Sequence, residues 1–472
     1  MPSVLERSAV DLAAAIRRRE LSSFDVVEQH IRRLEETHGR INAVAADRYE
    51  QARAAAGTCD QRIAQAALRG ESLEDLPPLY GVPFTVKESI AVAGMPQTAG
   101  LLARAGQVAQ GNALAVQRLI DAGAIPVAVT NTSELTLWIE SENPVYGRTN
   151  NPYDQSRTAG GSSGGEGAAV GVGGVPFGLG ADIGGSIRIP ALFNGVFGHK
   201  PSRGLVPNTG IWPPVNSTAE TMLATGPLTR RAEDLMPLLQ ILAERELGDP
   251  GSVSLDGLMV TTVENSSRLP MSRELRDARE RAVGALASAG ATIRSVSLPS
   301  WRDVLLPFLA VLQDEPSAKW RPTHALLAGQ NDAAFRPVDL ILGRGGHTLP
   351  TRLTLIAESL PSTAQRRRSL LAQVRALSDQ LAEAIGDGVL LHPAHLTPAP
   401  HHHRTYGRPW LTNASSIFNL AGVPVTEVPL GLSPAGVPVG VQVAAAAGAD
   451  HLSIAIAIEL EAVFGGWVMP PL

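Results

Sequence analysis

The sequence predicts an α/β protein with a mixed, twisted central sheet covered by helices on both faces. Amphipathic helical patterns lead directly into apolar runs of strand length, and this succession returns in the second half of the chain. Hydrophobic residues make up 44% of the 472 residues, enough for a large core. Because 1–300 and 385–472 both read as parts of one sheet, we expect a single large domain over residues 1–472.

The first amphipathic helix is expected in LSSFDVVEQHIRRLEETHG, residues 21–39. Ser22 and Asp25 have the spacing of a capping box, which predicts a helix start. The apolar residues that share one helical face are Val27, Ile31 and Leu34. Gly39 is the expected end of this helix.

A helix followed by a buried strand is expected in NALAVQRLIDAGAIPVAVTN, residues 112–131. Val116, Leu119 and Ile120 lie on the face that would turn inward, and Gly123 would end the helix. The apolar run 124–130 then reads as a strand buried on both faces.

The remaining elements repeat this pattern around one irregular stretch. Strand, helix and strand are expected at 257–263, 273–290 and 291–298, a further strand and a proline-rich loop at 388–400, and two strands over 425–445 joined by a turn at 433–436. The stretch 300–360 has weaker periodicity and more prolines, so we expect an irregular helical insertion there.

Composition and charge disfavour several classes of protein. The formal net charge of −5 provides no broad basic face, so nucleic acid is not expected as a partner. Apolar runs fall short of the roughly 18 residues of a membrane span, and the N-terminus has no signal-peptide pattern. Cys59 is the single cysteine, which excludes an intrachain disulfide and fits a cytoplasmic location.

Lysine is rare in this chain, and one lysine directly follows an apolar segment. Lys87, Lys200 and Lys319 are the only lysines among 40 basic residues. Lys87 follows the apolar segment VPFTV, so we expect it at the end of a buried strand, where desolvation lowers the pKa of an amine. A lysine can then act as a base, whereas arginine stays protonated.

Two glycine-rich and serine-rich segments supply hydroxyl groups that such a base could activate. They are TAGGSSGGEG at 158–167, which contains Ser162, and GADIGGSIRIP at 180–190, which contains Ser186. Glycines on both sides of a serine permit tight turns that bring backbone N–H groups near its hydroxyl. An anionic tetrahedral intermediate requires such N–H groups.

Together these segments resemble the amidase signature family, whose members hydrolyse or transfer amide C–N bonds. The resemblance covers most of the chain, through DLAAAIRRRELSS, GVPFTVKES, GGSSGGE, GADIGGSIRIPALFNGVFGHKPSRG and GVPVGVQVAA, whereas 300–360 has no counterpart that we can place. It implies a Ser-cisSer-Lys triad in which Lys87 is the base, Ser162 bridges after a cis peptide bond, and Ser186 is the nucleophile. It also implies an oxyanion hole made by the backbone N–H groups of Ile183, Gly184, Gly185 and Ser186.

Details of these motifs favour one branch of the family. GGSSGGEG and ADIGGSIR look like fatty acid amide hydrolase and its bacterial relatives, and Thr136 and Trp138 correspond to its acyl pocket. The amidase subunit of tRNA-linked amidotransferases typically has Thr and Gln where this chain has Ile183 and Ile189. We therefore expect a stand-alone amidase acting on a small-molecule amide, without metal or cofactor, with a homodimer as a candidate assembly. The alternatives are an amidotransferase subunit of the glutamyl-tRNA type or a non-catalytic, partner-dependent subunit.

Other polar groups have simpler interpretations. Asp182 and Arg188 flank the nucleophile and are expected to brace its loop as an ion pair, while Lys200 is expected to be structural and Lys319 to lie on the surface. The HHHR segment at 401–404 reads as a loop at the surface or pocket rim, because three adjacent side chains cannot all point toward one metal.

Overall fold

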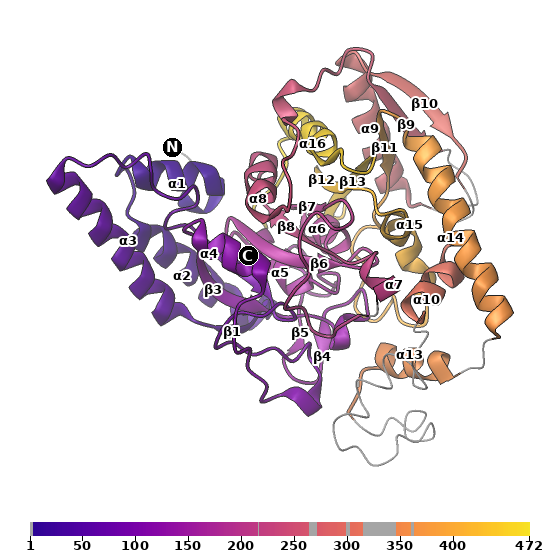
Figure 1. Cartoon of the computed structure of the whole chain (residues 1–472), viewed down its shortest axis with the longest axis horizontal. Coiled ribbons are helices and arrows are strands. Elements are labelled where there is room, and N and C mark those ends of the chain that lie inside the picture. Colours follow the sequence, from indigo (N-terminus) through magenta and orange to yellow (C-terminus); the bar gives the residue numbers. More distant parts are fainter. Residues whose placement is uncertain (1–2, 216, 264–270, 299–302, 315–345, 360–362) are drawn as a thin grey trace.

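A large mixed sheet forms the centre of the molecule (Figure 1). The computed structural model describes residues 3–215, 217–263, 271–298, 303–314, 346–359 and 363–472. Within these ranges the central sheet has 11 strands in the order β1-β3-β2-β6-β8-β7-β12-β13-β11-β9-β10. Since this sheet takes strands from both halves of the chain, the molecule is a single domain.

The strands of this sheet run in both directions. Their bounds are β1 Val44–Asp47, β2 Pro83–Lys87, β3 Ile125–Thr130, β6 Phe177–Asp182, β7 Phe197–Lys200, β8 Ala224–Thr229, β9 Met259–Val263, β10 Thr292–Val296, β11 Val389–His392, β12 Val425–Leu432 and β13 Pro438–Ala445. Strand β2 pairs in parallel with β3 and β6, and β9 pairs in parallel with β10 and β11. The other pairs are antiparallel. A separate ribbon joins β4 Glu142–Asn143 to β5 Gly147–Arg148.

Helices surround this sheet. Their bounds are α1 Ala9–Arg17, α2 Ser23–Ile41, α3 Tyr49–Arg69, α4 Leu114–Asp121, α5 Gly164–Gly171, α6 Arg188–Asn194, α7 Ser217–Glu220, α8 Leu235–Leu242, α9 Arg273–Ser288, α10 Leu305–Leu312, α13 Leu349–Ser359, α14 Ala364–Ile385, α15 Asn413–Ala421 and α16 Asp450–Phe464. Helices α5 and α6 each begin within one of the two serine-containing segments, two residues after Ser162 and two residues after Ser186.

Strand β11 shows how both faces of the sheet are buried. Val389 and Leu391 belong to the apolar cluster that includes residues of α9 and α16. Leu390, between them, belongs to a different cluster with residues of α10, α14 and α15. Successive side chains of a strand point to opposite faces, so helices cover both faces here. The predicted fold class is confirmed.

The predicted helix at 21–39 is present, but its end was placed wrongly. The Ser22 hydroxyl accepts a hydrogen bond from the Asp25 N–H at 2.9 Å, and α2 begins at the next residue. The helix passes through Gly39 and ends at Ile41, because Asn42 takes the left-handed conformation with φ of 54°. An exposed glycine only weakens a helix, whereas a left-handed residue ends it.

The other predicted elements agree closely with the structure. The turn between β12 and β13 is closed by a hydrogen bond from the Gly436 N–H to the Ser433 carbonyl at 2.9 Å. In the predicted insertion, the described parts are helical, since α10 and α13 lie there. The segment 315–345, which includes Lys319, lies outside the described residues.

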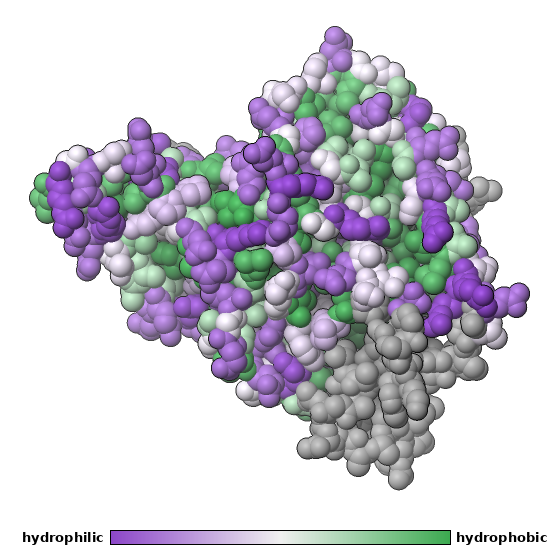
Figure 2. Space-filling view, in the orientation of Figure 1, coloured by the Kyte–Doolittle hydropathy of each residue, from purple (hydrophilic) through white to green (hydrophobic). Residues whose placement is uncertain are grey.

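The surface drawn in Figure 2 mixes hydrophilic and hydrophobic side chains, with hydrophobic groups interspersed among hydrophilic ones. Among the helices of the described ranges, none combines the length and the apolar character needed to cross a membrane.

Candidate active site

Lys87 is the last residue of β2, a strand held between two parallel neighbours. Its side chain is buried, and its Nζ donates hydrogen bonds to Ser162 Oγ at 2.6 Å and, more weakly, to the Ala181 carbonyl at 3.4 Å. Strand β2 is buried along its whole length, so the amine stem is surrounded by core residues. The structure thus brings together two residues that the sequence separates widely.

The environment of Lys87 favours the neutral amine. Burial away from water lowers the pKa of Lys87 to about 7, although the negative charges of Asp182, Glu166 and Glu88 oppose this shift. At neutral pH a large share of the molecules therefore carries a lysine that can accept a proton.

Ser162 lies in a turn that fixes its orientation. The Gly161–Ser162 peptide bond is cis, as the family resemblance implied. The Ser162 carbonyl accepts hydrogen bonds from Thr132 Oγ1 at 2.8 Å and from Ser141 Oγ at 3.1 Å. With its backbone held on one side and Lys87 on the other, the Ser162 hydroxyl has a defined direction.

Ser186 lies on the turn between β6 and α6, next to the Ser162 turn. The Ser163 N–H donates a hydrogen bond to the Ser186 carbonyl at 3.2 Å, which joins the two serine segments. Ser186 is 8% exposed and lines a pocket, whereas Ser162 is only 1% exposed. Ser186 is therefore the serine that a bound molecule can reach.

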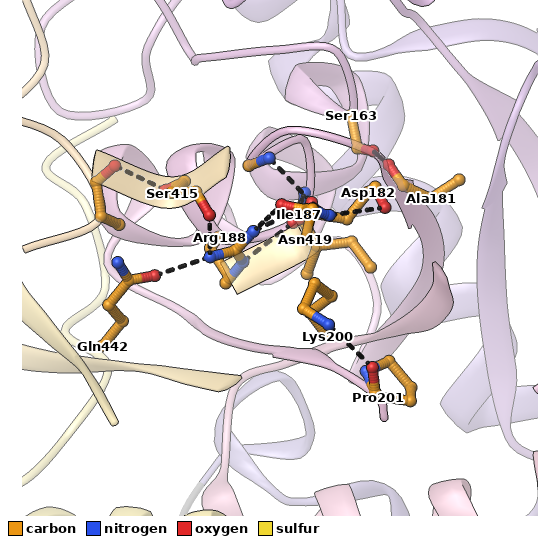
Figure 3. Close-up of polar contacts among 12 residues, drawn as sticks. Ser163, Ala181, Asp182, Ile187, Arg188, Lys200, Pro201, Ser415, Asn419 and Gln442 are labelled. Carbon is orange, nitrogen blue, oxygen red and sulfur yellow. Dashed lines mark hydrogen bonds and ion pairs between the residues drawn. The ribbon is translucent and has the colours of Figure 1, made fainter. Parts of the chain in front are cut away.

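Asp182 and Arg188, which flank the Ser186 turn in the sequence, form an ion pair, and Figure 3 shows the contacts of both side chains. Asp182 Oδ1 accepts the Gly185 N–H at 2.7 Å, and Oδ2 accepts the Ile187 N–H at 3.1 Å. The Arg188 guanidinium binds the same carboxylate, with Nε 3.0 Å from Oδ2. The predicted bracing ion pair is confirmed, and its side chains are fully buried.

The ion pair is balanced by further polar contacts. Burial alone would raise the pKa of Asp182, but the charge and hydrogen bonds of Arg188, together with Asn419, hold it well below its usual range. Figure 3 shows Arg188 between Asp182 and Gln442, whose Oε1 accepts from Arg188 Nη1 at 2.9 Å. Lys200 is also buried there and donates to the Pro201 carbonyl at 2.9 Å.

One of the four amides expected in the oxyanion hole is already engaged. The Gly185 N–H donates to Asp182, and Gly185 has a φ of +117°, a conformation that L side chains rarely adopt. The expectation that all four amides face a substrate oxygen therefore conflicts with this geometry at Gly185. The amides of Ile183, Gly184 and Ser186 remain the candidates.

The pocket in front of Ser186 is apolar and uncharged. It has a volume of about 160 Å³, and most of its wall is hydrophobic, including Leu137, Ile139, Ile183, Phe308, Leu309 and Leu312. Thr136 and Trp138, the predicted pocket residues, both lie on this wall. The lining residues that the structure describes include no ionisable side chain, and their polar groups are neutral: the serine and threonine hydroxyls, the Gln313 amide and the Trp138 indole.

Glu166 is a site residue whose position the sequence did not reveal. It lies in α5, whose residues are all buried, and its carboxyl accepts hydrogen bonds from Thr85 Oγ1 and from Thr130 Oγ1, the latter at 2.7 Å. Burial raises the pKa of Glu166 to about 7, against the effect of these hydrogen bonds and of Lys87. The available signal was a single acid inside the run GGEGAAVG, whose other residues are all small or apolar, as expected for a buried segment.

The HHHR loop lies at the surface, which is one of the two alternatives expected from the sequence. His401 and His403 are exposed, and His403 Nε2 lies 2.7 Å from Glu142 Oε2. Trp138 Nε1 donates to Thr405 Oγ1 at 2.8 Å, which connects this loop to the pocket wall. In the part of the chain that the structure covers, no group of at least three His, Cys, Asp or Glu side chains is arranged to hold a metal ion.

Comparison with known proteins finds relatives that cover nearly the whole chain. The chain is 40% identical over 484 residues to fatty-acid amide hydrolase 2-B of Danio rerio, covering 99% of this chain and 91% of the relative. It is 31% identical to a subunit of the glutamyl-tRNA(Gln) amidotransferase of Geobacillus thermodenitrificans, covering 93% and 94%. A crystal structure of an amidase superposes with a TM-score of 0.82 at 31% identity, covering 97% of this chain and 100% of that one. The Amidase family model matches residues 25–453, and the chain belongs to this family of amide hydrolases.

Proposed function

We propose that this amidase hydrolyses an uncharged carboxylic amide with an apolar acyl group, through a Ser-cisSer-Lys triad and an acyl-enzyme at Ser186. The observation that carries the proposal is the 2.6 Å contact between the buried Lys87 Nζ and Ser162 Oγ. In this contact Lys87 would be the base and Ser162 the proton relay. The second serine, Ser186, lines a pocket.

In the proposed reaction, protons move along the two hydroxyls. Neutral Lys87 takes the proton of Ser162 while Ser162 takes the proton of Ser186. Ser186 Oγ then attacks the amide carbonyl, and the negative oxygen is stabilised by backbone N–H groups among Ile183, Gly184 and Ser186. The proton returns through Ser162 to the leaving nitrogen as the C–N bond breaks. Water then repeats the cycle on the acyl-enzyme and releases the acid.

The composition of the pocket wall favours an apolar acyl group in the substrate. A charged group placed there would lose its hydration without gaining a partner from the lining residues that are described. The relative at 40% identity is a fatty-acid amide hydrolase, which supports the same class of substrate. A role as an amidotransferase subunit has weaker support, since that relative is 31% identical.

The first prediction concerns the nucleophile. A fluorophosphonate probe should label the wild-type protein at Ser186 and leave Ser186→Ala unlabelled, as read by mass spectrometry of the peptides. Ser162→Ala should label slowly, because it keeps the nucleophile and breaks the relay. Label on another residue of the wild-type protein would refute the assignment.

The same preparation tests whether the chain acts alone. The purified protein should hydrolyse an aryl acylamide without another chain, and Ser186→Ala should not. A partner-dependent subunit would give no hydrolysis in either sample. A homodimeric state, a cytoplasmic location and the lack of a nucleic-acid partner remain predictions from the sequence.

A further inference from the structure

A buried carboxylate beside the pocket joins two segments that are far apart in the chain. Glu134 opens the short 3₁₀ turn Glu134–Thr136, and its side chain is fully buried. His347 Nδ1 donates to Glu134 Oε1 at 2.6 Å. The other oxygen, Oε2, accepts from the Thr348 N–H at 2.8 Å and from Thr348 Oγ1 at 2.8 Å. All three donors belong to the residues directly before α13.

This contact lies where α13 begins. The Thr348 carbonyl accepts the Arg352 N–H at 3.1 Å, so Thr348 starts the first turn of the helix. A carboxylate near a helix N-terminus is stabilised by the N–H groups and the dipole there. Glu134 therefore fixes the position of α13 at its first turn.

An apolar contact fixes the same helix farther along. Leu355 of α13 is buried in a small cluster with Leu101 and Leu135. Leu135 directly follows Glu134, so the polar and the apolar contacts both join α13 to the same short turn.

The Glu134–Thr136 turn and α13, which these contacts join, both contribute residues to the pocket wall. Leu135 and Thr136, directly after Glu134, line the pocket of Ser186, and Thr354 of α13 lines it too. Leu135 and Thr136 have φ of 55° and 59°, which is rare for residues other than glycine and persists only where the surroundings impose it. The Glu134 contact is part of those surroundings.

We propose that Glu134 is a positioning residue for substrate selection: by holding His347 and Thr348 it sets α13 against the Leu135–Thr136 turn and so fixes the pocket wall that receives a long acyl group. Neither Glu134 nor its two partners lines the pocket, so the effect passes through Thr136 and Thr354. This inference rests on the function proposed above and adds a determinant of acyl length.

The test compares two p-nitroanilides, one of acetic acid and one of decanoic acid. His347→Leu removes one donor to Glu134, and Thr348→Val removes the hydroxyl donor. In the double variant, KM for the decanoyl anilide should rise about tenfold while its kcat stays within about twofold, because a buried carboxylate loses two of its partners. The kcat/KM for the acetyl anilide should not change.

His347→Asn is the matched control, because the asparagine amide places an N–H donor where histidine has Nδ1. It should keep KM for the decanoyl anilide near the wild-type value. Hydrolysis of the acetyl anilide shows in each variant that the catalytic centre is folded, and each single variant provides a milder change if the double variant unfolds.

The outcomes separate this inference from the proposed function. A wild-type protein that hydrolyses neither anilide would refute the proposed function. Hydrolysis by the wild type, together with unchanged KM in His347→Leu and Thr348→Val, would refute only the positioning role of Glu134. An equal loss on both substrates would refute it too, since it would indicate general structural damage.

Discussion

At Lys87, the proposed mechanism requires a side chain that can lose its proton, and this requirement gives a sharp test. Lys87→Arg keeps the positive charge and a similar reach, but a guanidinium stays protonated and cannot accept the Ser162 proton. The variant should fold, as judged by an unchanged thermal transition, and lose at least about a hundredfold in amide turnover. Near wild-type turnover in a folded variant would end the general-base interpretation.

The pH profile provides the control for this prediction. The pKa of Lys87 is lowered to about 7, so protonation should reduce kcat/KM as the pH falls below that value, with a plateau above it. Lys200 is also buried, and burial likewise lowers its pKa to about 7, yet its Nζ donates to a backbone carbonyl instead of a serine. Lys200→Arg should therefore keep the acid-side decline that belongs to Lys87.

At the scale of an element, the turn between β6 and α6 depends on the buried Asp182–Arg188 pair. Arg188→Met leaves the Asp182 carboxylate buried without its cation, and we expect a loss of about 3–5 kcal/mol in the free energy of unfolding. Urea unfolding followed by circular dichroism measures this loss. Arg32→Met, which removes the largely exposed partner of Glu28, is the control and should change the midpoint little. Equal effects of the two changes would contradict the bracing role.

Helices, strands and turns could be predicted where the residues that determine them are close together in the sequence. The strand that ends at Lys87 and the turn at Ser433 were visible because apolar runs and turn residues act over a few positions. The end of α2 at Ile41 was missed because the next residue, Asn42, takes the left-handed conformation that glycine more often provides.

The proposed catalytic residues were identified through motif resemblance, whereas the pocket was predictable only in part. Thr136 and Trp138 were expected on its wall, and they lie there. The contact of Glu134 with His347 joins positions 213 residues apart, and no periodicity or spacing encodes such a pairing. Burial of Glu166 among threonines likewise follows from packing of α5 that sequence patterns do not specify.

At the scale of the whole molecule, both ends of the described chain are tied to the core. The Asp234 carboxylate accepts the Ala9 and Val10 N–H groups at the start of α1, at 2.9 and 3.0 Å. Near the other end, Trp467 Nε1 donates to the Gly171 carbonyl of α5 at 2.9 Å, and Figure 1 shows the C-terminus beside that helix. The termini therefore contribute to the stability of the sheet that carries the site.

Trp467→Ala tests this contribution. The side chain is 5% exposed, so its loss should leave a cavity and reduce the free energy of unfolding by about 3–5 kcal/mol. The kcat/KM of the folded enzyme should stay near that of the wild type, because Trp467 lies outside the described pocket lining. Val468→Ala, at a side chain 43% exposed, is the neighbouring control and should unfold close to the wild type. A Trp467→Ala variant as stable as that control would contradict the role of the C-terminus.

The division of the site between the sheet and the outer helices has a consequence for protein engineering. Lys87 and the two serines are held by β2, β6 and the buried helices that follow the serine turns, whereas α10 and α13 contribute Phe308, Leu309 and Thr354 from a different part of the chain. The pocket-lining residues Phe308, Leu309 and Thr354 can therefore be varied together while the proposed reacting groups keep their supports. A library confined to these two helices is a direct route to amidases with new acyl preferences, and the Glu134 contact sets the geometry that such a library should preserve.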